Sequence, residues 1–258
     1  MIQEAISRQI ASLLGSPVRR VSSESGGSIN AAYRIELADS RPYFLKTNDG
    51  SLYAMFEAEA RGLSLLREAC RGIRVPEVKG HDKTDDGSLS WLLLEYIENS
   101  RPGSLYQSNT PHKTWASFYS HERLMPQMKA AIDSGLLQPG LARNFDNLFA
   151  RLGEIFPDEP PALLHGDLWG GNYLCDRDGT PVIIDPAVYF GHREMEIAFT
   201  KLFGGYDRAF YTSYNEAWPL CKGHEQRVDI CNLYPLLVHT NLFGSSYAGR
   251  VASIIKNF

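Results

Sequence analysis

Three absences narrow the function of this 258-residue chain before any motif is considered. Basic residues are not in surplus, because 26 Lys and Arg face 30 Asp and Glu, and a formal charge of -4 gives no general attraction to nucleic acid. Cysteine is scarce, with four residues and no Cys-x-x-Cys pair, so we expect a reducing, cytoplasmic setting rather than a zinc ribbon or disulfide scaffold. No stretch approaches the roughly 20 apolar residues that cross a bilayer, so neither nucleic acid nor membrane is an expected partner.

Hydrophobic patterning divides the chain into two parts of different character. An amphipathic first helix ending at Gly15 is followed by short strand patterns and by one helix, over residues 52–69, with a single buried face. Beyond a hinge near residues 95–104 the patterns are mostly helical. The sequence therefore predicts an α+β protein with a β-rich N-terminal lobe, residues 1–97, and a larger, mostly helical lobe, residues 98–258. The expected strands are 18–25, 31–37, 43–46 and 91–97; the later helices are 114–132, 140–155, 193–203 and 225–258, the last interrupted at Pro235.

A short segment of the second part combines a turn with polar residues that suit metal and proton chemistry. Strand patterns flank the sequence Asp176-Arg177-Asp178-Gly179, which is a good hairpin turn. In simple antiparallel register, Asn172 then lies opposite Ile184 and beside Asp185. An amide oxygen and a carboxylate at one end of a hairpin can share a hard cation such as Mg²⁺. Asp167, on the preceding loop, could take a proton from an incoming hydroxyl.

The order of these residues is typical of phosphoryl transfer, which needs a positioning carboxylate and an oxygen pair for magnesium. The spacing Asp167-x4-Asn172-x12-Asp185 resembles the catalytic and metal-binding loops of the protein-kinase-like superfamily, and His165-Gly166-Asp167 resembles its small-molecule branch. The resemblance implies a bilobal fold with a small antiparallel N-terminal sheet, ATP and Mg²⁺ as cofactors, and Asp167 as the catalytic residue. The alternative is a simple hairpin, with His165 and Asp167 capping neighbouring turns.

Such a fold requires a lysine on its third strand that binds the α- and β-phosphates. Lys46 follows an apolar strand pattern in the right place, although on its own it would be interpreted as a solvated lysine at a strand end. Its carboxylate partner would be Glu57 or Glu59 in the next helix. We prefer Glu59, because it lies beside the buried seam of that helix.

Two further segments are candidates for nucleotide contacts. Gly26 and Gly27 offer flexible backbone amides for a loop that covers phosphates, but they do not form a Gly-x-Gly-x-x-Gly motif. The end of the last N-terminal strand, Glu95 to Ile97, would be the hinge whose backbone reads the adenine edge.

A longer set of matches makes the chain similar to one branch, the fructosamine kinase (ketosamine-3-kinase) family. This resemblance covers nearly the whole chain and implies an ATP-dependent kinase acting on the sugar 3-hydroxyl of ketoamines, the adducts formed when sugars glycate amines. The phosphorylated product is expected to decompose and release the amine, which is deglycation. A monomer acting on a small or protein-bound ketoamine is expected. The matching segments include Pro161 to Trp169, Gly171-Asn172, Asp185-Pro186-Ala187, Glu194-x-Glu196-x-Ala198 and Phe203 to Tyr206.

Two departures from the family accompany this resemblance. Ser28 stands where some members have a cysteine, and the family's helix with a Leu-His pair is missing after Ser104. Either that helix is deleted or part of the chain is missing from the sequence. Aromatic residues that could line a sugar pocket, with packing in the core as an equal interpretation, are Trp115, Trp169, Tyr189 and His239.

Three other functions compete with this interpretation. A metal-dependent hydrolase would use His165, Asp167 and Asp185, but it explains neither Lys46 nor the position of Asn172 between the aspartates. A regulatory pseudokinase that only binds nucleotide would not need all of these residues. A related kinase for aminoglycosides or choline would favour a more acidic cleft than an acidic surplus of four suggests.

Overall fold

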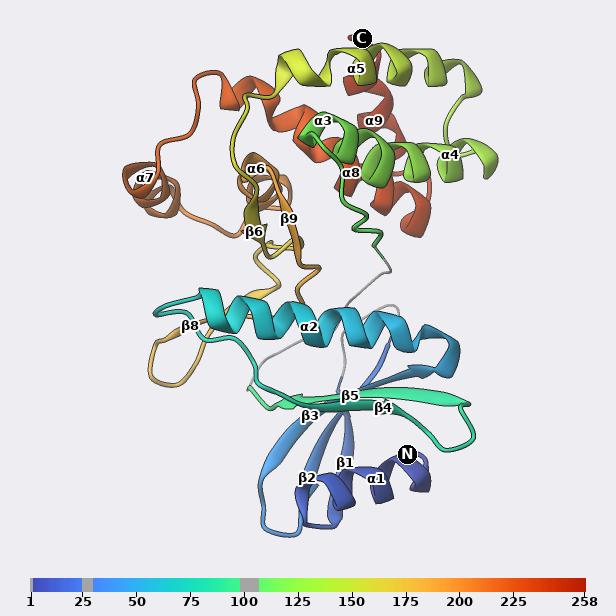
Figure 1. Ribbon diagram of the computed structural model, residues 1–258, viewed down its shortest axis with the longest axis vertical. Coiled ribbons are helices and arrows are strands. Elements are labelled where there is room, and N and C mark those ends of the chain that lie inside the picture. The colour runs from blue at the N-terminus through green and yellow to red at the C-terminus, as the bar shows by residue number, and fades with distance from the viewer. Residues whose placement is uncertain (1, 25–29, 98–106) are drawn as a thin grey trace. The chain divides into compact units, whose positions relative to one another are not determined.

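A computed structural model describes residues 2–24, 30–97 and 107–258, which form two compact units (Figure 1). The first unit comprises residues 1–106 and 165–189, and the second comprises 107–164 and 190–258. The segment 165–189, which carries the three polar candidates of the hairpin region, therefore packs with the N-terminal part of the chain. The division into lobes at residue 97 stays a prediction.

A five-stranded antiparallel sheet forms the centre of the first unit, in the order β1-β2-β3-β5-β4. The strands expected from sequence are present. The structure adds β4, which sequence patterning missed because its residues are polar apart from Val78 and it lies at the sheet edge. The strands are β1 (Val18–Glu24), β2 (Ala31–Leu37), β3 (Pro42–Asp49), β4 (Val78–Lys83) and β5 (Leu89–Glu95).

Two helices cover opposite faces of this sheet (Figure 1). Helix α1 (Glu4–Leu14) ends at Gly15, whose φ of 67° is the left-handed conformation that glycine adopts without strain. Its Ile6 and Ile10 pack into one core with Tyr43 and Leu45 of β3. Side chains alternate along a strand, so the next residue, Lys46, points to the opposite face, where α2 (Tyr53–Ala69) lies.

The hairpin predicted from sequence is present in the first unit. Strands β7 (Tyr173–Cys175) and β8 (Pro181–Ile183) pair in antiparallel register, with Leu174 opposite Val182. The Ile184 amide donates to the Asn172 carbonyl over 3.1 Å, so the expected opposition of these two residues is confirmed.

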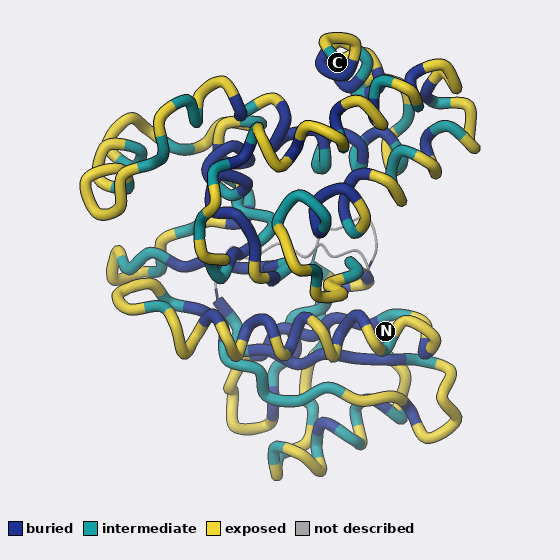
Figure 2. The backbone as a smooth tube through the Cα atoms, turned by 45° about the horizontal axis from the view of Figure 1, so that its top comes forward, coloured by how far each residue is buried: buried dark blue, intermediate teal, exposed yellow. Residues whose placement is uncertain are grey.

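The second unit is mostly helical, as expected. Two short strands elsewhere in the chain, β6 (Ala162–Leu164) and β9 (Tyr189–Gly191), form a separate pair. Figure 2 shows how burial varies along the backbone. Helix α7 was not predicted, and none of its residues is buried. Within the described ranges, no helix has the length and apolar character to cross a membrane. The helices are α3 (Trp115–Phe118), a π-helical turn (Tyr119–Leu124), α4 (Met125–Asp133), α5 (Ala142–Ile155), α6 (Glu194–Leu202), α7 (Arg208–Ala217), α8 (His224–Phe243) and α9 (Ala248–Ile255).

The expected interruption at Pro235 is wrong, because α8 continues through this residue. Proline has no N–H, so it cannot bond the carbonyl of Cys231 four residues earlier. The fully buried Tyr119 hydroxyl instead donates towards the carbonyls of Ile230, at 2.6 Å, and Cys231, at 3.2 Å. A donor from another helix is thus shared between these two carbonyls, and the second of them is the carbonyl that proline frees.

Candidate active site

Lys46 lies at the centre of the candidate site, bound by two carboxylates within the first unit. Its Nζ donates to Oε1 of Glu59 at 2.6 Å and to Oδ1 of Asp185 at 2.8 Å. The Lys46 side chain is 0% exposed, and the Glu59 and Asp185 side chains are 2% and 6% exposed. Of the two glutamates considered from sequence, Glu59 is therefore the one in contact, because it is on the buried face of α2 while Glu57 is exposed.

The description of Lys46 as a solvated lysine at a strand end is wrong. The residue lies inside β3, and its neighbours across the sheet are Ala32 and Leu92. Burial alone would lower the pKa of Lys46, but the negative charges of Asp185 and Glu59 outweigh it and hold the pKa above its ordinary value. The lysine is therefore a buried cation whose charge depends on both carboxylates.

The loop before the hairpin is fixed to the segment around Asp185 by the backbone and ring of His165. The His165 carbonyl accepts from the Ala187 amide at 2.8 Å, and its Nε2 lies 3.0 Å from the Ile184 carbonyl. That carbonyl can only accept, so Nε2 carries the proton, and Nδ1 accepts from the Asp167 amide at 3.3 Å. Burial lowers the pKa of His165 to about 4, which keeps the ring neutral at pH 7 and preserves both contacts.

Gly166 is required by the same close approach. Its φ is 82°, and a Cβ built there would lie 2.0 Å from the Ala187 carbonyl oxygen. No side chain fits at this distance, which explains why the middle residue of His165-Gly166-Asp167 has none. This glycine allows the two loops to touch.

Asp167 and Asn172 are joined directly. The Asn172 side-chain nitrogen donates to the backbone oxygen of Asp167 and to its Oδ2, both at 2.9 Å. Because the nitrogen is used in this way, the amide oxygen of Asn172 points away from Asp167. Asn172 is buried and Asp167 is half-buried. The contact orients the carboxylate that sequence analysis singled out as catalytic.

The oxygen atoms of two side chains next to the hairpin suit magnesium. The Asn172 amide oxygen and the Asp185 carboxylate are hard oxygen ligands, and both residues are buried. No cluster of three or more His, Cys, Asp or Glu that could hold a metal occurs in the part of the chain that the structure describes. A magnesium site here would therefore rely on an amide and on the substrate's phosphates, which is how Mg²⁺ is commonly bound in enzymes that transfer phosphate.

The other predicted nucleotide contacts have different outcomes. Gly26 and Gly27 lie outside the described residues, as does Ser104. The carboxylate of Glu95 is taken by an ion pair with Arg74, so only the backbone of Glu95 could read adenine. Ile97 packs with residues of the hairpin in a small buried cluster.

Of the four aromatic candidates, Trp169 presents most surface, with 39% exposed. Tyr189 is buried, and Trp115 stacks on Tyr119 with 5.3 Å between ring centroids. His239 is half-buried, and its Nδ1 lies 2.8 Å from the Pro235 carbonyl within α8. Packing therefore explains Trp115 and Tyr189. Trp169, two residues after Asp167 in sequence, remains exposed.

Sequence analysis missed two features that support the site. Gly62 of α2 approaches Val188 so closely that a Cβ would lie 2.8 Å from its Cγ2. Arg74, after α2, binds both Glu95 and Asp176. Neither residue has a local sequence signal, because Gly62 contacts Val188 and Arg74 contacts Asp176, both more than a hundred positions away.

A profile of the fructosamine kinase family matches residues 2–104 and 98–258. A probable ketoamine kinase of Enterococcus faecium is 34% identical, covering 90% of this chain and 93% of that protein. The chloroplastic protein-ribulosamine 3-kinase of Arabidopsis thaliana is 33% identical, covering 93% of this chain and 83% of that protein.

Solved structures agree with these sequence relatives. The structure of a candidate fructosamine-3-kinase from Thermobifida fusca has 32% identity and a TM-score of 0.83, covering 97% of each chain. A choline kinase and macrolide phosphotransferases, at 17% identity or less, share the fold alone. The predicted protein-kinase-like α+β fold is thereby confirmed, and the chain is a kinase that belongs to the fructosamine kinase family.

Proposed function

We propose that this kinase transfers the γ-phosphate of ATP, with magnesium, to the sugar 3-hydroxyl of a ketoamine, and that it acts in the cytoplasm as a monomer in deglycation. The observation that carries the proposal is the buried bridge from Lys46 to Glu59 and Asp185, beside the Asp167–Asn172 contact. The name of the Arabidopsis relative, which specifies a ribulosamine and position 3, supports the acceptor. The cysteines that the structure describes are all free, which supports a reducing compartment.

Each residue has a distinct task in this proposal. Asn172 and Asp185 would hold magnesium, whose charge would offset that of the phosphates. Lys46 would bind phosphate oxygens, while Glu59 keeps its ammonium group in place. Asp167 would orient the sugar hydroxyl and accept its proton, with its own carboxylate held by Asn172. Trp169, which is 39% exposed, would contact the sugar ring.

Two aspartate variants test the division of roles. Asp167→Asn keeps the side chain's shape but removes its charge and its ability to accept a proton, so turnover on a fructosyl amine should fall about 10²–10⁴-fold. ATP affinity should persist in that variant, since Lys46, Asn172 and Asp185 are unchanged. Asp185→Asn should lose magnesium-dependent ATP affinity as well. Full turnover by Asp167→Asn would show that another residue is the catalytic base.

The acceptor is tested by a panel. ATP consumption should depend on fructosyl-lysine or ribosyl-lysine and not on an aminoglycoside or choline. The position of the phosphate is read from the product by NMR, and amine release is followed by mass spectrometry. Light scattering measures the mass in solution and so tests whether the enzyme is a monomer. Consumption driven only by choline or an aminoglycoside would contradict the ketoamine proposal.

A further inference from the structure

The segment between α2 and β4 makes an unexpected pairing with the β7–β8 hairpin. The Arg74 amide donates to the Pro181 carbonyl at 2.8 Å, and the Ile183 amide donates to the Arg74 carbonyl at 3.1 Å. Arg74 and Val182 thus form an isolated parallel bridge. This backbone pairing places the Arg74 side chain between the hairpin and the end of β5.

The Arg74 guanidinium joins two carboxylates from different elements. Nη1 donates to Oδ2 of Asp176 at 3.0 Å, and Nη2 donates to Oε1 of Glu95. Glu95 is further held by the Glu77 amide, which donates to its Oε2 at 3.2 Å. The other oxygen of Asp176 accepts from the amides of the hairpin turn, including that of Thr180 at 2.9 Å. Both carboxylates are therefore fixed to backbone, so the arginine connects two rigid points.

These two points correspond to the two ends of the proposed nucleotide site. The hairpin begins after Asn172 and ends before Asp185, the proposed magnesium ligands. The end of β5 carries the backbone proposed to read adenine. Ile97, just beyond Glu95, packs against Ile184 in the same buried cluster. An ion pair and an apolar contact thus connect the same two elements.

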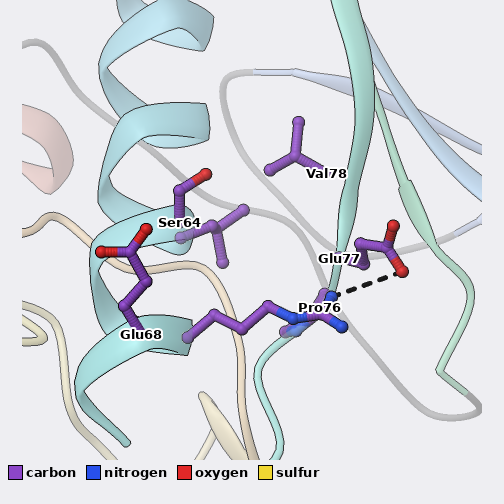
Figure 3. Close-up of a pocket in the computed structure, with 7 residues that line it drawn as sticks. Ser64, Glu68, Pro76, Glu77 and Val78 are labelled. Carbon is purple, nitrogen blue, oxygen red and sulfur yellow. Dashed lines mark ion pairs between the residues drawn. The ribbon is translucent and has the colours of Figure 1, made fainter.

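Contacts on the other side of the segment are weaker. A cavity of about 450 Å³ separates α2 from residues 76–78, and Figure 3 shows Ser64 and Glu68 of α2 and Val78 around it. One ion pair crosses it, between Arg67 and Glu77 at 3.4 Å, and the two side chains are 50% and 45% exposed. Exposed pairs of this kind contribute little to stability. Arg74 contacts the hairpin through both its backbone and its side chain.

We propose that Arg74 is a positioning residue that sets the distance between the adenine end and the magnesium end of the nucleotide site. This inference rests on the proposed function. A guanidinium can bind two carboxylates in a fixed plane, whereas a lysine ammonium is a single point of charge on a flexible chain. Loss of the Arg74 guanidinium leaves Asn172 and Asp185 in place beside the hairpin, but it loosens the position of the hairpin relative to β5. MgATP binding is impaired, and ketoamine binding is not.

The test compares Arg74→Lys, Arg74→Ala and Asp176→Asn with the wild-type enzyme. Arg71→Ala is the matched control, because Arg71 is an exposed arginine of the same segment. We expect the KM for MgATP, and the magnesium concentration for half-maximal rate, to rise about 10–100-fold in Arg74→Ala, as for residues that orient metal ligands. Arg74→Lys and Asp176→Asn should lie between that variant and the wild type. The KM for the ketoamine should stay unchanged in all variants.

Two results would overturn the inference while leaving the proposed function intact. A lower melting temperature with both KM values unchanged would mean that Arg74 is only structural. Equal increases in both KM values would mean a general loosening of the site. If Arg74→Ala does not fold, the same readouts in Arg74→Lys and Asp176→Asn decide the question. A wild-type enzyme that consumes no ATP with any acceptor would instead refute the proposed function, and the inference with it, which separates the two failures.

Discussion

Replacing Lys46 with Met tests whether the buried lysine is a structural as well as a functional group. The side chains of Lys46, Glu59 and Asp185 are almost completely removed from solvent. Methionine has a similar volume, so the variant leaves little cavity. It does leave two negative charges without their cation in an apolar environment.

The expected cost follows from that burial. Removing one partner of a buried ion pair typically destabilises a protein by about 3–5 kcal/mol, whereas an exposed pair contributes about 0.2–1 kcal/mol. Small domains are stable by only about 5–15 kcal/mol, so Lys46→Met should lose a large share of its stability. A loss of turnover in this variant must therefore be corrected for the folded fraction.

Urea unfolding at pH 7, followed by circular dichroism, measures this cost. Lys79→Met is the matched control, because Lys79 of β4 also pairs with a glutamate, Glu77, at 2.8 Å, and that glutamate is 45% exposed. The control should lose no more than about 1 kcal/mol.

A small effect would refute this reasoning. If Lys46→Met unfolds within about 1 kcal/mol of the wild type at pH 7, the lysine behaves as an exposed residue. Its contacts with Glu59 and Asp185 would then not exist in solution. The buried bridge on which the proposed function depends would have to be abandoned.

Three further predictions concern the supporting contacts. Gly166→Ala should destabilise the protein and abolish turnover. Gly179 has a similar φ of 79° but open space around it, so Gly179→Ala should lower the unfolding free energy in urea by only about 1–2 kcal/mol. Burial lowers the pKa of His165 from 6.5 to about 4, so the neutral ring stabilises the fold above pH 6.5. This contribution, up to about 3 kcal/mol, should be lost as the pH falls from 6.5 to 4. An NMR titration of the ring should give the low pKa. Tyr119→Phe should lower the unfolding free energy by about 1–3 kcal/mol, because the buried carbonyls of Ile230 and Cys231 lose the hydroxyl that they share. An unchanged value would contradict this account of Pro235.

Local patterns in the sequence were sufficient to predict much of this molecule. The hairpin register follows from the Asp176–Gly179 turn alone, because a two-stranded ladder has few alternatives once its turn is fixed. The helix ending at Gly15 follows from an apolar face and a terminal glycine. In each case the interacting residues are close in sequence.

Features that depend on distant residues were not predictable in the same way. The π-helical turn provides the tyrosine whose hydroxyl reaches the carbonyl freed by Pro235, and these residues are more than a hundred positions apart. Local reasoning correctly predicts that proline breaks a helix but cannot include a donor from another element. Arg74 and Asp176 are likewise 102 positions apart.

Lys46 shows how such a distant contact can still leave a trace in sequence. Its neighbours Phe44 and Leu45 indicate a buried strand, and a lysine on the buried face of such a strand is costly unless carboxylates reach it. One partner, Glu59, is 13 positions away on the next helix, while Asp185 is 139 positions away. A cation inside an apolar strand is therefore itself an indication of acidic partners elsewhere in the chain. The structure supplies the second partner, Asp185, whose place beside Lys46 fits its proposed role near the same phosphates that the lysine would bind.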